Sequence, residues 1–72
     1  MKILEIAIDL PLVNDNLDEI LTARLTEIGF EGFWTDDSLF KAYVNEEKFN
    51  KKEFESIILA YLPNAQCKMQ TL

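Results

Sequence analysis

The sequence of 72 residues contains no histidine, one cysteine, two glycines and two prolines. Without histidine, the chain lacks the commonest general base and the commonest metal ligand of proteins. A single cysteine excludes an intramolecular disulfide and a zinc site built from several cysteines, whereas small secreted domains usually carry several disulfides. We therefore expect a cytoplasmic protein without a metal ion and without a catalytic histidine.

Phosphate-binding loops and long apolar runs are missing as well. The two glycines, Gly29 and Gly32, belong to neither a Walker sequence nor a dinucleotide-binding fingerprint. No run of apolar residues approaches the ~18 that are needed to span a bilayer, and the first residues lack the pattern of a signal peptide. The sequence predicts no membrane segment and no cofactor site in this chain.

Acidic residues outnumber basic ones, with 13 Asp and Glu against 7 Lys and Arg and a net charge of −6. An acidic surface repels phosphate backbones, so direct binding to nucleic acid is not expected. The same surface would favour the encounter with a basic partner. The simpler interpretation is that the charge only keeps the domain in solution.

No group of residues points to catalysis. The acidic pairs Asp36-Asp37 and Glu46-Glu47 lack the spacing of a calcium-binding loop, so we interpret them as solvated. Cys67 alternates with Met69 and has no neighbouring base. We expect Cys67 to be a small buried hydrophobic side chain and not a nucleophile.

Segments with strand periodicity and segments with helical periodicity alternate along the chain. Alternating apolar residues predict four strands, at 2–10, 30–35, 39–44 and 67–72. Apolar residues at helical spacing predict two helices, at 14–29 and from about 50 to 62. The order β-α-β-β-α-β predicts one α+β domain over residues 1–72, a ferredoxin-like split βαβ sandwich with two helices on one face of a four-stranded antiparallel sheet.

The ends of the predicted helices carry recognisable capping residues. Asn14 or Asn16 can cap the first helix, and Asn16 with Glu19 has the spacing of a capping box. Asn50 with Glu53 has the same spacing at the start of the second helix. Gly29 follows the last apolar position of the first helix, where a glycine commonly ends a helix.

The sheet face without helices is the best candidate for a binding surface. Alternation sends Phe33 and Trp34 to opposite faces of their strand, so one of them leaves the core. An exposed apolar patch on this face would fit a protein surface or another domain of the same chain. RNA-binding sheets surround such aromatics with basic residues, whereas the surroundings here are acidic and the RNP-type motif of basic residues and aromatics is absent. The candidate residues are Ile3, one of Phe33 and Trp34, Leu39, Lys41 and Tyr43.

The sequence also resembles a known protein family. The stretch 27–33, with sequence EIGFEGF, follows an amphipathic helix, and LFKAYV at 39–44 precedes Glu46, Glu47 and Phe49. These segments, after an opening strand with Leu4-Glu5-Ile6, resemble the N-terminal domain of the bacterial ribosomal protein methyltransferase family PrmA. The resemblance covers nearly the whole chain.

The resemblance implies a substrate-recognition domain. In that family, this domain binds ribosomal protein eleven of the large subunit. A separate Rossmann-like domain holds S-adenosylmethionine and methylates amino groups of the bound protein. We therefore expect this chain to be the non-catalytic N-terminal part of a methyltransferase, with its own catalytic domain and the ribosomal protein as partners. No catalytic or cofactor residue of the family has a counterpart in these 72 residues.

Two other functions are compatible with the same fold. A free-standing ferredoxin-like domain could bind a small ligand or a protein and dimerise through sheet edges or faces, but the loop at 11–14 lacks the glycine such ligand sites often have. A small enzyme of the acylphosphatase kind would need an anion cradle and an arginine. The one arginine, Arg24, lies in the middle of a predicted helix, which disfavours this activity.

Overall fold

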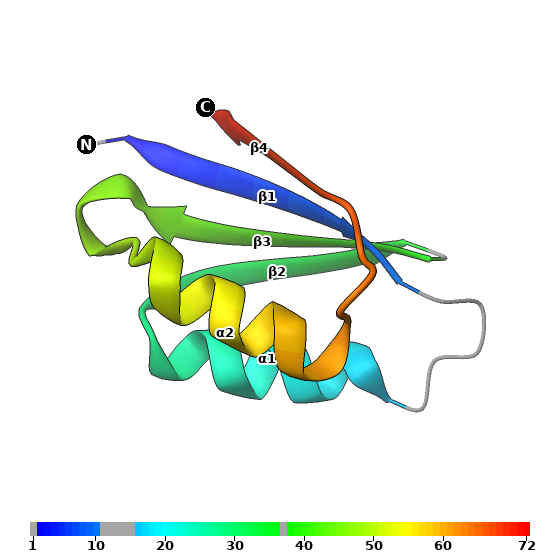
Figure 1. Ribbon diagram of the computed structural model, residues 1–72. Helices are drawn as coiled ribbons and strands as arrows, with labels where there is room; N and C mark the ends of the chain where they lie inside the picture. Colours follow the sequence, from blue (N-terminus) through cyan, green and yellow to red (C-terminus); the bar gives the residue numbers. More distant parts are fainter. Residues whose placement is uncertain (1, 11–15, 37) are drawn as a thin grey trace.

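A computed structural model describes residues 2–10, 16–36 and 38–72. These residues form four strands and two α-helices in the predicted order (Figure 1). The strands make one antiparallel sheet of order β2-β3-β1-β4, and both helices lie on the same face of it. This is the predicted ferredoxin-like split βαβ arrangement. The elements are β1 (Ile3–Asp9), α1 (Leu17–Glu27), β2 (Phe30–Asp36), β3 (Leu39–Asn45), a short 3₁₀ helix (Glu46–Lys48), α2 (Lys51–Tyr61) and β4 (Cys67–Thr71).

The core lies between the sheet and the helices. In the two central strands, β1 and β3, buried side chains alternate with more exposed ones up to Val44, as in strands with one covered face. Apolar side chains of both helices complete the core from the other side. Its buried members are Leu4, Ile6, Ile8, Leu10, Leu21, Leu25, Phe30, Phe40, Ala42, Val44, Phe54, Ile58 and Leu62.

The two helices begin differently. The Asn50 side chain accepts a hydrogen bond from the Glu53 backbone N–H at 3.1 Å, as the sequence predicts. Asn16 precedes α1, but its side chain makes no capping hydrogen bond, so the predicted capping box with Glu19 is wrong. The backbone of Asn16 is left-handed, with φ of 63°, whereas a capping side chain is normally presented from extended backbone. Asn14, the other predicted cap, lies outside the described residues.

A bulge in β2 determines which aromatic side chains enter the core. Phe30 pairs with Val44, and Gly32 pairs with the next residue, Tyr43, so Glu31 is an extra residue on β2. The extra residue lets both Phe30 and Phe33 face the helices although they are three positions apart. Trp34 consequently faces away from the helices.

Gly29 ends α1 as predicted, and its backbone explains why a glycine is needed. Its φ is 105°, and its N–H donates a hydrogen bond to the Thr26 carbonyl at 3.2 Å. We expect Gly29→Ala to lower the free energy of unfolding by about 1–2 kcal/mol, because a Cβ strains backbone of positive φ. The nearest atom to that Cβ, in the Lys48 side chain at 3.5 Å, leaves ordinary space, so the cost is conformational.

Urea denaturation measures the free energy of unfolding of Gly29→Ala, and Gly32→Ala is its matched control. Its Cβ would also have ordinary contacts, the nearest to the Tyr43 ring at 3.5 Å, and no positive φ opposes it. We expect a change within about 0.5 kcal/mol. Equal losses in the two variants would contradict the conformational explanation.

Candidate protein-binding face

The sheet has one face that neither helix covers, which we call the open face (Figure 1). Outward side chains of all four strands form it, and the strand register arranges them in cross-strand rows. Three rows carry the side chains that could contact a partner.

The first row joins Gly32, Tyr43, Glu5 and Gln70 across the four strands. The Tyr43 hydroxyl donates a hydrogen bond to Glu5 Oε2 at 2.9 Å, and Gln70 Nε2 donates one to Glu5 Oε1 at 2.7 Å. The Tyr43 and Gln70 hydrogen bonds lower the pKa of Glu5, and the Glu5 carboxylate raises the pKa of Tyr43. This row is a fixed polar network that links three strands.

The second row contains Trp34, Lys41, Ala7 and Lys68. Trp34 is the only tryptophan of the chain, and 48% of its surface is exposed. Lys41 Nζ lies over the indole, 5.2 Å from the ring centroid, in a cation–π arrangement. The row therefore presents a large aromatic ring that is held by its neighbour and accessible to solvent.

The third row places Leu39 between two carboxylates, Asp9 and Asp36. Both carboxylates are exposed, and neither forms an ion pair with another described residue. An apolar side chain between two free negative charges is suited to a lysine or arginine, because these side chains combine an apolar stem with a cationic end.

The structure brings most of the predicted site residues together. Trp34, Lys41 and Tyr43 line a shallow depression of about 470 Å³ together with Gly32 and Phe33. The Phe33 ring nevertheless packs on the helix side, with its centroid 5.9 Å from that of Phe40, so Trp34 is the aromatic residue that faces outward. Leu39 belongs to the neighbouring row.

Sequence reasoning missed the acidic and amide residues of the open face. Asp9, Asp36, Glu5 and Gln70 take part in the rows, but their polar character alone is typical of any solvated strand face. The strand register could have identified them, because once Glu5 is paired with Tyr43 the pairs of the other rows follow. Ile3 lies half-buried at the end of β1, opposite Asn45.

Cys67 is exposed, which contradicts the predicted buried side chain. Its side chain does lie on the helix side of the sheet, but β4 is the edge strand, and all five of its residues are exposed there. Partial burial and the negative charge of Asp9 raise the pKa of the thiol, which opposes formation of a nucleophilic thiolate. Among the described residues, no three Cys, Asp or Glu side chains are grouped to hold a metal ion.

Within residues 2–10, 16–36 and 38–72, neither helix has the length and apolar character needed to cross a bilayer. Comparison with protein-family models, with curated proteins and with solved structures finds no match to this chain. The assignment of a function therefore depends on the geometry of the open face and on the sequence resemblance.

The hydrogen bonds to Glu5 predict a pH dependence of stability. Because its folded-state pKa lies below the ordinary value of 4.5, the ionised carboxylate stabilises the fold above that pH. This stabilisation is lost as the pH falls through the lowered pKa. In urea denaturation from neutral to acidic pH, we expect Glu5→Gln to lose less stability than the wild type. A Glu5 carboxyl that titrates at or above 4.5, followed by NMR, would contradict this prediction.

Proposed function

We propose that this chain is a protein-recognition domain that binds a basic protein through its open face. The observation that carries the proposal is Trp34, a half-exposed tryptophan on a sheet face that no helix covers. Tryptophan is among the residues that contribute most to binding energy at protein interfaces. In this position, the indole ring is not part of the core of the domain.

Two observations support a basic partner. The chain has a net charge of −6, which attracts cationic partners over several ångströms. The row of Asp9, Leu39 and Asp36 offers, beside an apolar side chain, two carboxylates that form no ion pair with the residues that the structure describes. A lysine or arginine of the partner would cover Leu39 with its methylene groups and place its charge beside a carboxylate.

The more specific proposal is that the domain recognises the substrate of a cytoplasmic ribosomal protein methyltransferase. The resemblance to the PrmA family supports this function, with ribosomal protein eleven of the large subunit as the basic partner. In this proposal, S-adenosylmethionine and the methyl transfer belong to a separate catalytic domain. In this proposal, the two glycines of this chain have structural roles and do not bind the cofactor: Gly29 ends α1, and Gly32 lies beside the Tyr43 ring in β2.

Calorimetric titration with ribosomal protein eleven tests the proposal. We expect saturable binding that Trp34→Ala weakens about 30-fold, which corresponds to a hot-spot contribution of about 2 kcal/mol. Leu59→Ala is the matched control, because Leu59 is also a large exposed apolar residue, 63% exposed, but lies on α2. We expect it to leave the affinity unchanged.

The charge contribution is tested in the same titration. Asp36→Asn is expected to weaken binding modestly, and the wild-type affinity is expected to fall as ionic strength rises, because salt screens exposed charges. Equal effects of Trp34→Ala and Leu59→Ala would contradict the choice of face. Absence of binding by the wild type would contradict the ribosomal protein as partner and favour a free-standing interaction domain.

A further inference from the structure

The C-terminal quarter of the chain is nearly free of charge. All 13 acidic residues lie at or before position 55, and residues 56–72 carry a single charged side chain, Lys68. This segment comprises the second half of α2 and all of β4. Depletion of charged residues distinguishes the centre of a protein interface from the rest of a surface. The depleted segment is therefore a candidate interface apart from the open face.

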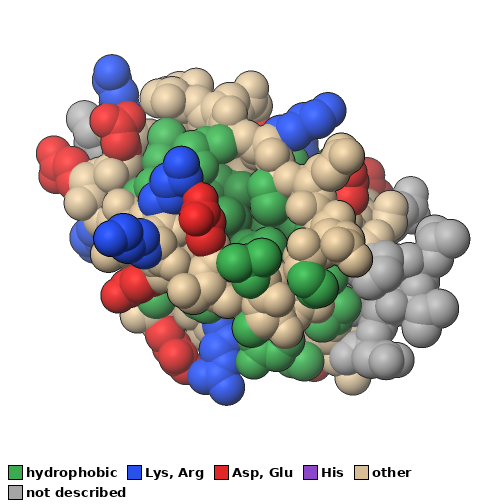
Figure 2. Space-filling view, viewed as in Figure 1, with side chains coloured by type: hydrophobic (Ala, Val, Ile, Leu, Met, Phe, Trp, Pro, Cys, Tyr) green, Lys and Arg blue, Asp and Glu red, His purple; other side chains and the backbone are tan. Residues whose placement is uncertain are grey.

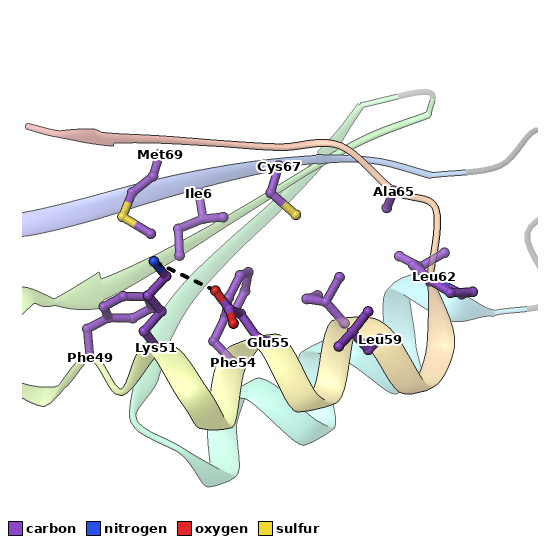
Figure 3. A pocket seen from close by; sticks show the side chains of 12 residues that line it. Ile6, Phe49, Lys51, Phe54, Glu55, Leu59, Leu62, Ala65, Cys67 and Met69 are labelled. Carbon is purple, nitrogen blue, oxygen red and sulfur yellow. Dashed lines mark ion pairs between the residues drawn. The ribbon is translucent and has the colours of Figure 1, made fainter.

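An apolar groove of about 340 Å³ runs between α2 and β4 on the helix side of the sheet. Met69 and Cys67 point from β4 toward α2, and Leu59 lies on the α2 side (Figure 3). Met69 is 48% exposed and Leu59 is 63% exposed. Figure 2 shows hydrophobic side chains in the hollow between α2 and the upper strands. An ion pair between Lys51 Nζ and Glu55 Oε1, at 3.8 Å, lies beside them.

Among residues 2–10, 16–36 and 38–72, no strand pairs with the outer edge of β4, which lies beside this groove. The Leu72 N–H donates to the Ile3 carbonyl at 2.9 Å, and the Gln66 carbonyl accepts from the Asp9 N–H at 3.4 Å. Backbone groups of successive residues point to opposite edges of an antiparallel strand. The even-numbered residues of β4 therefore face β1. The odd-numbered residues, Cys67, Met69 and Thr71, direct their N–H and C=O groups to the free edge and their side chains to the groove side.

We propose that β4 pairs antiparallel with β4 of a second copy of this chain, with Met69 opposite Met69. The pairing joins only residues whose backbone groups face the free edge, so every second position forms hydrogen bonds. It uses the whole strand and sets Cys67 opposite Thr71. It also sets Lys68 opposite Gln70, whereas a shift by two residues toward the start of β4 would set Lys68 opposite Lys68, an unfavourable pair of like charges.

Charge is the reason to assign this edge to a second copy. Two chains of net charge −6 repel each other over most of their surfaces. Pairing through β4 brings together the two segments that carry few charges and directs most of the acidic residues away from the contact. The result is a two-fold symmetric, eight-stranded sheet in which the two apolar grooves meet at the Met69 side chains.

This pairing does not depend on the proposed function, because its backbone contacts lie at the β4 edge and its apolar contacts on the helix side, and only Lys68 and Gln70 of β4 belong to the open face. The open face of each copy keeps Trp34 accessible at the opposite end of the strand order. In this dimer, the second copy covers the β4 edge. Covering an exposed strand edge is one way in which proteins avoid uncontrolled edge pairing.

Sedimentation equilibrium of the whole chain over a range up to millimolar concentration tests the proposal. We expect the mass to rise with concentration from 8.4 kDa toward twice that value. Met69→Lys should remain monomeric, because two like charges would then lie opposite each other at the two-fold axis. Thr35→Lys is the matched control, since Thr35 is exposed on β2, the other edge strand, and it should associate as the wild type does.

Disulfide crosslinking tests the register and does not depend on how well Met69→Lys folds. In the double variant Cys67→Ser, Met69→Cys, the two thiols should crosslink, because opposite hydrogen-bonded residues have Cα atoms about 5.5 Å apart. In Cys67→Ser, Thr71→Cys, the thiols would be four residues out of register, about 13 Å apart, and should not crosslink.

Three results would overturn the proposal. A wild-type mass of 8.4 kDa at every concentration would leave the edge to an extended segment of another protein. Association that Met69→Lys and Thr35→Lys leave equally intact would place the contact elsewhere. Equal crosslinking at positions 69 and 71 would exclude the proposed register.

Discussion

Burial of one face of the sheet beneath two short helices is the constraint on which the structure depends. Ile6 and Ile8 of β1 and Phe40 and Ala42 of β3 are completely buried against the helix side chains. A small domain has little other apolar surface to remove from water, so these contacts provide most of its stability. Because the helices cover only one face of the sheet, the other face and the strand edges remain available for binding.

Two of the uncovered surfaces, the open face and the β4 edge, differ in chemistry. The open face carries charges and hydrogen bonds, because its side chains were never available to the core. Its rows follow directly from the register that core packing fixes, since a shift by one residue would exchange the two faces of a strand. The β4 edge is apolar on its helix side because Cys67 and Met69 pair with the buried residues Ile8 and Ile6 of β1. Cys67 and Met69 are nevertheless exposed, because the helices do not cover β4.

Most of the fold was predictable because periodicity reports burial directly. The six elements, the inward residues of β3 and the glycine at the end of α1 all follow from local patterns of apolar residues. The left-handed backbone of Asn16 and the bulge at Glu31 were not predictable, since neither changes the composition of its segment. The bulge mattered for the site, because it lets Phe30 and Phe33 share one face.

The candidate site was predictable only where a side chain was unusual by itself. Lys41 and Tyr43 could be assigned to an outward face from alternation once the strands were placed, whereas alternation left open which of Phe33 and Trp34 faces outward. The carboxylates of Asp9 and Asp36 acquire meaning only from their position on either side of Leu39, which depends on pairing between strands distant in sequence. The exposure of Cys67 likewise depends on the position of β4 in the sheet, which local alternation does not contain.

The most direct test of the central claim is to map the surface that a basic protein contacts. Isotopically labelled chain would be titrated with ribosomal protein eleven of the large subunit while backbone amide resonances are followed by NMR. We predict saturable shifts clustered in β2 and β3, around Trp34, Leu39 and Tyr43. Shifts confined to α1 or α2, or no shifts at saturating partner, would contradict it.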